Sequence, residues 1–543
     1  MDFKSQLPLL FITIYLASCN SVSHNNGKQV FNYNESNGIS SLDPAFSRDL
    51  ESMWACNQLF DGLLSLDSSL NIIPCIASSY EIDSAGTAYT FYLRNDVVFH
   101  DNACFEGGKG RKVIASDFIF SFNRLLDDAT ASPGRWVFDK IRTLNPFEAP
   151  NDSTLIIHLS APFPAFPGLL TTQYCNVIPK EAIDAYGADF RSNPVGTGPF
   201  QFAFWMEEVA LVFHKNPHYW EKDEFGNGLP YLDAVKIDFV RDMNAEYLGL
   251  LKGEYDFMSG IHQSYKDELL DANGNLSESF HDKIRLQRVP FIKTDYLGIL
   301  VDDSLPISAT SPLMNKKVRQ ALNFALDRKK MVRFLRNNSV YAAEAGFVPP
   351  GLPGFGPTAS YGYSYQPEKS ARLLAESGFP QGKGLGSITL ATTSDYVDLC
   401  EFVQHEWQKI GVNVSIDVLP GGTHREVVAK SQVLMFRKSW LADYADAGNF
   451  LGLFHSSAFS PDGPNYTHYQ SEDFDNLFDQ ASAQTDDSLR FIQYKQLDSL
   501  VMESAVIIPL YYDQVSHFVR KEISGFETNP VNMLDLRKVK KAS

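Results

Sequence analysis

The stretch of sequence that decides the fold is "ITLATTSDYVDLCEFVQHEWQKIGVNVSIDVLPGGTHREVVAKSQVLMF", residues 388–436. Its apolar residues switch between a two-residue and a helical period, which predicts strands and helices in turn. The predicted order is strand 388–393, helix 395–411, strand 412–419, helix 423–432 and strand 433–436. This βαβαβ order is typical of an α/β protein with a parallel sheet and right-handed crossovers. Upstream, residues 315–335 are predicted to form one long amphipathic helix.

A charged loop is predicted directly after the third strand, in "RKSWLADYADAGNF", residues 437–450. Ligands of open parallel sheets bind outside the carboxyl ends of the strands, so this loop is expected at a ligand cleft. It gathers Arg437, Asp443 and Asp446 around the large aromatic ring of Trp440. From this charge pattern alone, catalysis, metal binding and ligand capture all remain open.

The length and charge of the chain limit what kind of protein it is. At 543 residues the chain is too long for one hydrophobic core, so two or three domains are expected. The formal net charge is −18, and the dense basic run is confined to "RKVKK" near the C-terminus. Nucleic-acid binding needs a basic surface, so the composition excludes a nucleic-acid partner.

The first twenty residues, "MDFKSQLPLLFITIYLASCN", predict export. A Lys precedes an apolar run of about twelve residues, which is too short to span a bilayer and is typical of a signal peptide. Ala17 and Ser18 before Cys19 resemble the lipobox of bacterial lipoproteins, in which the cysteine is acylated. We therefore expect a signal peptide over 1–18, a lipid-anchored tether over 19–27 and a periplasmic or cell-envelope location. A plain signal sequence with a chance cysteine is the alternative.

The remaining cysteines predict neither a metal site nor a defined disulfide. They are far apart and contain no C-x-x-C pair, which excludes zinc-ribbon and thioredoxin-like sites. An exported protein can form disulfides, but an odd number leaves at least one thiol free. Their spacing does not determine a pairing among Cys56, Cys75, Cys104, Cys175 and Cys400.

Motifs of enzymes and metal sites are missing from the sequence. It contains no G-x-S-x-G, H-E-x-x-H or Walker A motif. The acidic segment 271–282 has Leu276 at the position where a calcium-binding loop needs glycine. We therefore predict no catalytic residue, no metal site and no cofactor.

Ten short blocks occur in order along the mature chain. They are "SLDPA", "LFDGLL", "YTFYLRNDVVFHD", "ASDFIFSFNRLLD", "NPVGTGPF", "NPHYW", "VRQALNFALDR", "PEKSARLLAESGF", "WLADYADAGNFL" and "IIPLYY". Behind a lipobox, this series resembles the family 5 solute-binding proteins of peptide and nickel ABC importers. The resemblance implies an α/β type II periplasmic-binding-protein clamshell, with two α/β lobes and an extra subdomain. It implies lobe Ia over 28–62, 190–288 and 506–543, lobe Ib over 63–189, and lobe II over 289–505.

By this resemblance the protein is an extracytoplasmic substrate-binding lipoprotein of an ABC importer and carries out no chemical step. It is expected to capture oligopeptides or dipeptides between its lobes and to deliver them, as a monomer, to the permease subunits. The same fold binding nickel chelates, haem or oligosaccharide is the alternative within the binding class. An extracytoplasmic hydrolase or a signalling lipoprotein is the alternative outside it.

The resemblance also assigns roles within the charged loop. Asp443 matches the position that takes the α-ammonium group of the peptide, a role that suits a buried carboxylate paired with a desolvated ammonium. Arg437 matches a position close to the ligand, where it can meet a ligand carboxylate or pair with Asp443 and Asp446 in the empty state. Asp446 itself is expected to be a turn residue.

Further contacts are expected from the neighbours of these residues and from the opposite lobe. Trp440 is expected to line a side-chain pocket, and Ser439 and Leu441 to offer backbone hydrogen bonds to an extended peptide, as in strand addition. The opposite lobe is expected to contribute the end of the first strand, with Asn34, Glu35 and Ser36.

Overall fold

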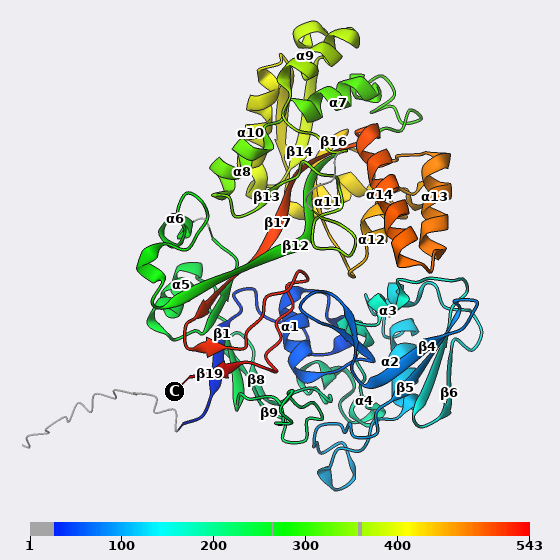
Figure 1. Cartoon of the computed structure of the whole chain (residues 1–543), viewed down its shortest axis with the longest axis vertical. Coiled ribbons are helices and arrows are strands. Elements are labelled where there is room, and N and C mark those ends of the chain that lie inside the picture. Colours follow the sequence, from blue (N-terminus) through cyan, green and yellow to red (C-terminus); the bar gives the residue numbers. More distant parts are fainter. Residues whose placement is uncertain (1–26, 263, 357–360, 543) are drawn as a thin grey trace, which may run out of the picture.

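The computed structural model describes residues 27–262, 264–356 and 361–542. Its elements form an upper and a lower body that two long strands connect (Figure 1). Buried apolar side chains form one large cluster in the lower body and two in the upper, and one of the upper clusters also includes Leu70 of the lower body. Cys19, the predicted signal peptide and nearly all of the predicted tether lie outside the described residues.

The βαβαβ unit predicted for the upper body is present. It consists of β14 (Ser387–Thr392), α10 (Val397–Gln408), β15 (Asn413–Val418), α11 (Gly421–Ala429) and β16 (Met435–Leu441). β14 lies between β15 and β16 and runs parallel to both. The predicted end of the third strand was wrong: β16 continues to Leu441, so Arg437 and Trp440 lie in a strand and not in a loop. The reason is that every residue of β16 is paired with β12.

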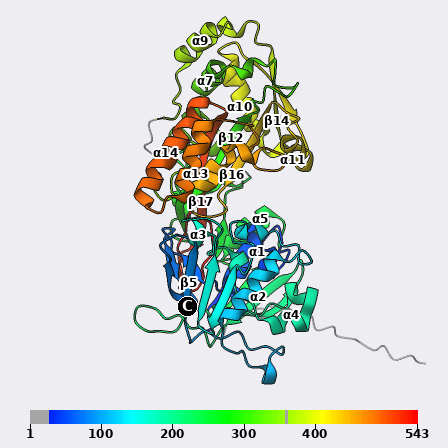
Figure 2. The same ribbon diagram turned by 90° about the vertical axis from the view of Figure 1, so that its right-hand side faces the viewer.

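Two long antiparallel strands, β12 (Ile284–Ile299) and β17 (Ile507–Arg520), run from the lower body into the upper one (Figures 1 and 2). In the upper body they extend the parallel unit into a mixed sheet with the order β11-β17-β12-β16-β14-β15. β11 (Phe257–Ser259) pairs with the lower end of β17, and β13 (Tyr341–Ala342) pairs with its upper part. The register of β12 shifts between Pro290 and Thr294, where the pair passes from one body to the other.

The lower body contains two four-stranded sheets. The first has the order β1-β10-β9-β8 and the second β4-β5-β7-β6. The strands are β1 (Val30–Asn34), β4 (Ala77–Ile82), β5 (Ala88–Leu93), β6 (Phe147–Asn151), β7 (Thr154–His158), β8 (Phe200–Met206), β9 (Ala210–Lys215) and β10 (Ala234–Asp238). The helices of this body are α1 (Leu50–Leu59), α2 (Ala115–Leu126), α3 (Phe166–Leu169), α4 (Lys180–Tyr186), α5 (Met243–Lys252) and α6 (Lys266–Leu269). Short pairs are formed by β2 (Leu64–Leu66) with β3 (Ile72–Pro74) and by β18 (Ile523–Ser524) with β19 (Lys540–Lys541).

The single helix predicted over 315–335 is instead two helices, α7 (Lys316–Phe324) and α8 (Arg328–Arg336). The buried guanidinium of Arg328 donates to the Pro509 carbonyl at 2.5 Å, and Asp327 caps the start of α8. This tertiary contact bends the chain where local periodicity continues the helix. The other helices of the upper body are α9 (Pro367–Glu376), α12 (Gly448–Leu451), α13 (Glu472–Ala483) and α14 (Asp487–Ser504).

The five cysteines within the described ranges are all free thiols. In the same ranges, no group of His, Cys, Asp and Glu side chains is arranged to hold a metal ion. No helix among the described residues has the length and apolar character needed to cross a membrane.

Candidate functional site

The exposed edge of β16 is the first part of the candidate site. The backbone N–H of Ala442 donates to the Ile292 carbonyl at 3.0 Å, so alternate residues of β16 turn their backbone groups toward β12. Ser439 and Leu441 therefore turn theirs to the opposite edge. β14 covers that edge only as far as Phe436, and no other described strand pairs with it. The edge beyond Phe436 can accept one more extended chain.

Asp443 follows this edge directly, and Asn449 orients its carboxylate. Asn449 Nδ2 donates to Asp443 Oδ2 at 3.0 Å, and Asn449 Oδ1 accepts from Trp440 Nε1 at 2.8 Å and from the Asp443 backbone N–H at 3.2 Å. The Asp443 side chain is exposed, and within the described chain no Lys, Arg or His lies within ion-pair distance of it. Partial desolvation raises the pKa of Asp443, and the bond from Asn449 opposes that shift. The carboxylate is thus fixed in place and lacks a cation.

Arg437 does not pair with Asp443 or Asp446, so that part of the sequence prediction was wrong. Its buried guanidinium forms an ion pair with the fully buried Asp295 of β12 and stacks on the Tyr396 ring, 3.0 Å from the centroid. Strand register explains why Arg437 pairs with Asp295. Asp295 lies opposite Ser439, and Ser439 and Arg437 are two residues apart on β16, so their side chains lie on the same face of the sheet. Its Nε atom is buried without a partner among the described residues. Burial lowers the pKa of Arg437 to about 10.

Asp446 lies in the turn that begins α12, which agrees with the role expected for it. Its Oδ1 accepts from the Gly448 backbone N–H at 2.8 Å, and its Oδ2 accepts from Arg490 of α14 at 2.6 Å. Both charged side chains of this pair are buried. Asp446 therefore holds the loop of Asp443 against α14.

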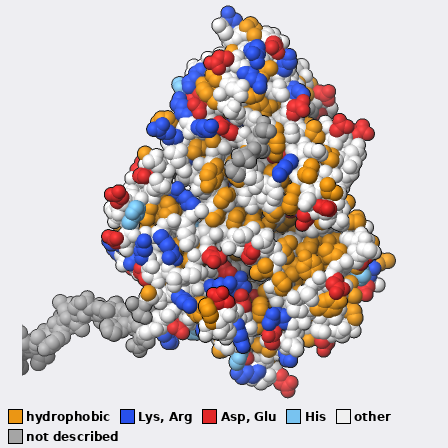
Figure 3. Space-filling view, in the orientation of Figure 1, with side chains coloured by type: hydrophobic (Ala, Val, Ile, Leu, Met, Phe, Trp, Pro, Cys, Tyr) orange, Lys and Arg blue, Asp and Glu red, His pale blue; other side chains and the backbone are white. Residues whose placement is uncertain are grey.

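Aromatic residues of the lower body meet the Asp443 loop. The ring of Trp136 stacks on Tyr444 with centroids 6.4 Å apart, and the ring of Tyr174 meets Trp136 edge-on at 6.5 Å. Burial, and then the negative charge of Asp443, raise the pKa of Tyr174 to about 12. Hydrophobic side chains also gather on the lower body over α3 and β4, below α13 and α14 (Figure 3).

The three residues expected at the end of β1 have different environments. Asn34 is buried, and its amide group exchanges hydrogen bonds with the Val240 backbone at 2.7 and 2.9 Å. Glu35 is buried too, and its Oε1 has no partner among the described residues. Burial, Glu51, Glu246 and Asp49 together raise the pKa of Glu35. Ser36 is half-buried, and no described hydrogen bond or ion pair joins these three residues to the β16 group.

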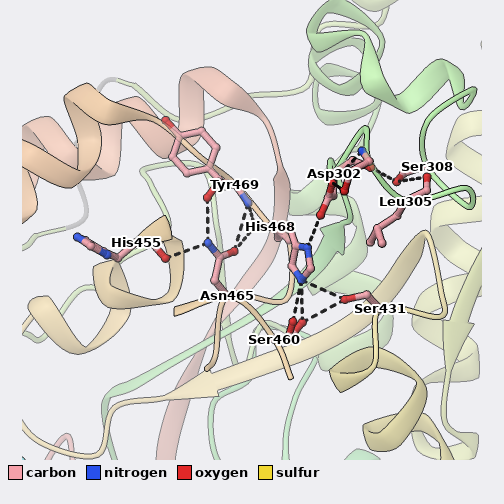
Figure 4. Close-up of polar contacts among 11 residues, drawn as sticks. Asp302, Leu305, Ser308, Ser431, His455, Ser460, Asn465, His468 and Tyr469 are labelled. Carbon is pink, nitrogen blue, oxygen red and sulfur yellow. Dashed lines mark hydrogen bonds and ion pairs between the residues drawn. The ribbon is translucent and has the colours of Figure 1, made fainter. Parts of the chain in front are cut away.

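A Ser-His-Asp arrangement lies elsewhere in the upper body (Figure 4). His468 Nδ1 is 2.8 Å from Asp302, and its Nε2 is 3.1 Å from the Ser431 hydroxyl and 3.2 Å from the Ser460 hydroxyl. Nε2 is also 3.0 Å from the Ser460 carbonyl, and the Phe459 ring stacks on the imidazole at 4.5 Å. Ser460 is buried, so its hydroxyl is not presented to a substrate. The group ties three loops together.

Sequence reasoning missed Asn449, Trp136 and Tyr174. Asn449 stands in "AGNF", where an amide is typical of a turn. Trp136 and Tyr174 lie in short 3₁₀ turns that carry no periodic signal. The one signal in the sequence was that Trp136 and Tyr174 are large aromatic residues set among turn residues.

Comparison with known sequences and structures decides the family. A sequence model described as "Bacterial extracellular solute-binding proteins, family 5 Middle" matches residues 71–462. The chain belongs to this family. Members are periplasmic substrate-binding components of transporters, and not enzymes.

Relatives and solved structures of this solute-binding protein agree with the assignment. The "Glutathione-binding protein GsiB" of Salmonella typhimurium is 27% identical over 91% of this chain and 90% of its own. The "Dipeptide-binding protein" of Escherichia coli is 25% identical over 85% of this chain and 84% of its own. DppA from Helicobacter pylori in complex with peptide STSA superposes with a TM-score of 0.74 at 25% identity, covering 95% of this chain and 98% of its own. The unliganded open form of the periplasmic murein tripeptide binding protein MppA superposes with a TM-score of 0.78 at 22% identity. The match covers 95% of this chain and 98% of the MppA chain. These structures confirm the predicted clamshell fold of this solute-binding protein.

Proposed function

We propose that the protein captures short peptides with a free N-terminus between its two bodies. The observation that carries the proposal is the placement of Asp443, an oriented carboxylate without a cation, at the end of an unpaired strand edge. An extended peptide offers the two complementary features, a row of backbone amides and an α-ammonium group. The edge at Ser439 and Leu441 would bind the amides, and Asp443 would bind the ammonium.

The energetics of these contacts favour peptides of varied sequence. Strand addition uses backbone groups that every peptide has, so it gives affinity without selecting side chains. An ion pair with a partly desolvated carboxylate is stronger than one in water and is costly to leave unmade. Asp443 would therefore discriminate against blocked N-termini, while Trp440 would line a side-chain pocket. Asn34, Glu35 and Ser36 would face the ligand from the lower body, and Arg437 would meet a ligand carboxylate.

Two relatives support the choice of ligand class. Their names state glutathione and dipeptides as the molecules they bind. Both kinds of molecule carry a free α-ammonium group and at least one amide, although the first amide of glutathione is formed by the γ-carboxyl of its glutamate. In the proposed complex, Asp443 would bind the ammonium group and the edge of β16 would bind the amides.

Capture and delivery would proceed by closure of the two bodies. The lobes would be 28–62, 190–288 and 506–543 for Ia, 63–189 for Ib and 289–505 for II, with β12 and β17 as the crossing strands. A ligand that contacts both bodies shifts the population toward the closed state. The closed monomer, tethered through lipidated Cys19 after removal of a signal peptide, would dock on the permease of an ABC importer.

The test is to identify what the protein carries and what it binds. Mass spectrometry of the natively folded protein, followed by denaturation, should release intact peptides. Calorimetry should then give tight binding of mixed short peptides and no binding of nickel chelates, haem or oligosaccharides. Tight binding of one of the latter alone overturns the peptide assignment, and recovery of cleaved peptides favours a hydrolase.

A further inference from the structure

An open basic pocket of about 420 Å³ lies in the lower body, at the outer ends of the two crossing strands. Its lining residues are Asn275, Leu276, His281, Ile284, Arg285, Leu286, Arg288 and Lys521. Arg285 and Arg288 belong to the start of β12, and Lys521 follows the last residue of β17. Lys and Arg side chains gather over the start of β12 in the space-filling view (Figure 3).

Both guanidinium groups of the pocket have unused hydrogen-bond donors. Arg285 Nε and Arg288 Nη2 are buried and have no partner among the described residues. In those same residues, no carboxylate lies within ion-pair distance of either arginine. Arg288 Nε donates to the Ser516 hydroxyl at 3.3 Å, which fixes the side chain at the pocket wall. Burial lowers the pKa of Arg288, as expected for a cation that lacks a partner.

One carboxylate, that of Asp271, acts on Arg288 from beyond ion-pair distance. Asp271 attracts Arg288, but its Oδ1 already accepts from the backbone N–H groups of Asn273 and Asn275, at 2.9 and 2.8 Å. On a chain of net charge −18, the pocket brings together two arginines, a lysine and a histidine, and neither arginine forms an ion pair with a described carboxylate. Leaving buried donors unpaired costs free energy, which a bound anion would recover.

We infer that this pocket binds a phosphate group. The planar fork of arginine matches phosphate oxygens bidentately, and a lysine adds a point charge. More than one cation around an open pocket suits an anion with more than one negative charge. The anion would bridge the start of β12 and the chain after β17, and so tie together the lower ends of the two crossing strands. Inorganic phosphate and the phosphate of a lipid headgroup share this chemistry.

The test is thermal unfolding and calorimetry with inorganic phosphate at constant ionic strength. Phosphate should raise the Tm of the wild-type protein, because a ligand of the folded state stabilises it. In Arg285→Gln/Arg288→Gln the rise should vanish and binding should weaken by at least about tenfold. Arg333→Gln, which removes an exposed arginine of α8, should behave as wild type.

Lys521→Gln serves as a second variant, because Lys521 is exposed and its substitution leaves folding intact. It should bind phosphate more weakly than wild type does. An unchanged Tm of the wild-type protein, or the same rise in every variant, overturns the inference.

Vesicles of phosphatidic acid and of phosphatidylcholine distinguish the two sources of the phosphate group. Binding to phosphatidic acid that both arginine substitutions abolish identifies a headgroup, and phosphate binding without vesicle binding identifies the free anion; either supports the site.

Discussion

Trp136 of the lower body stacks on Tyr444 of the upper body, with ring centroids 6.4 Å apart and an interplanar angle of 27°. Tyr444 follows Asp443 directly, so the stack joins the two bodies beside the carboxylate of the candidate site. The stack therefore lies next to the residue that we propose for binding the ligand. Aromatic pairs of this kind contribute about 0.5–1.5 kcal/mol beyond the area they bury.

Removing this stack should weaken peptide binding. Trp136→Ala and Tyr444→Ala should each lower affinity, on the proposal that the ligand-bound state keeps this stack. Calorimetry on the two single variants and the double variant forms a double-mutant cycle, with an expected coupling energy of about 0.5–1.5 kcal/mol. Additive losses, with no coupling, would show that the two rings do not act together in the bound state.

The ion pair between Arg437 and Asp295 should matter for stability. Asp295 is fully buried, so Arg437→Met leaves an uncompensated carboxylate, relieved only in part by Lys293 Nζ at 3.3 Å. Breaking such a pair costs about 3 kcal/mol in the free energy of unfolding, measured by urea denaturation. The double variant Arg437→Met/Asp295→Asn should recover much of the loss. If it is no more stable than the single variant, the buried charge is not the cause.

Asp498 of α14 gives a pH-dependent prediction. It is fully buried, accepts from the Phe347 backbone N–H at 2.9 Å and from the Tyr361 hydroxyl at 3.0 Å, and has a pKa raised to about 7 by burial. An aspartate in the unfolded chain releases its proton at about pH 4. Between about pH 4 and pH 7, Asp498 therefore keeps its proton in the folded state and loses it in the unfolded state. The stability contributed by this group is therefore present at low pH and is lost as the pH rises through about 7.

Asp498→Asn should remove that dependence. Between about pH 5 and pH 8, its free energy of unfolding should rise relative to wild type by about 2–3 kcal/mol, measured by urea denaturation at each pH. Glu246, whose pKa burial also raises to about 7, remains in both proteins, so its contribution cancels in the comparison. A constant difference across this range would contradict the raised pKa of Asp498.

The sequence predicted those parts of the fold that depend on local pattern. The alternation over 388–436 placed β14, α10, β15 and α11, because each element carries its own period. The end of β16 was missed because Arg437, Lys438 and Ser439 interrupt the apolar run. The strand that pairs with this segment is β12, which is far away in the sequence. The break between α7 and α8 was missed for a similar reason, since the contact of Arg328 with Pro509 is tertiary.

The candidate site was predicted only in part. Asp443 was identified through its resemblance to a known family, and its role stays a proposal. The partner of Arg437 was not predictable, because strand register decides it. Trp136 and Tyr174 come from another body, and nothing in their local sequence indicates that Trp136 stacks on Tyr444 or that Tyr174 packs against Trp136.

The central claim is that Asp443 binds the α-ammonium of a peptide, and one measurement tests it directly. Calorimetry compares a peptide with its N-acetylated form on wild type, Asp443→Asn and the control Asp462→Asn, which changes an exposed aspartate of the same body. Asp443→Asn should weaken the free peptide by about 2–5 kcal/mol and leave the acetylated peptide nearly unchanged, because only the former loses an ion pair. Asp462→Asn should bind both peptides as wild type does. An equal loss for the free and the acetylated peptide would contradict the account.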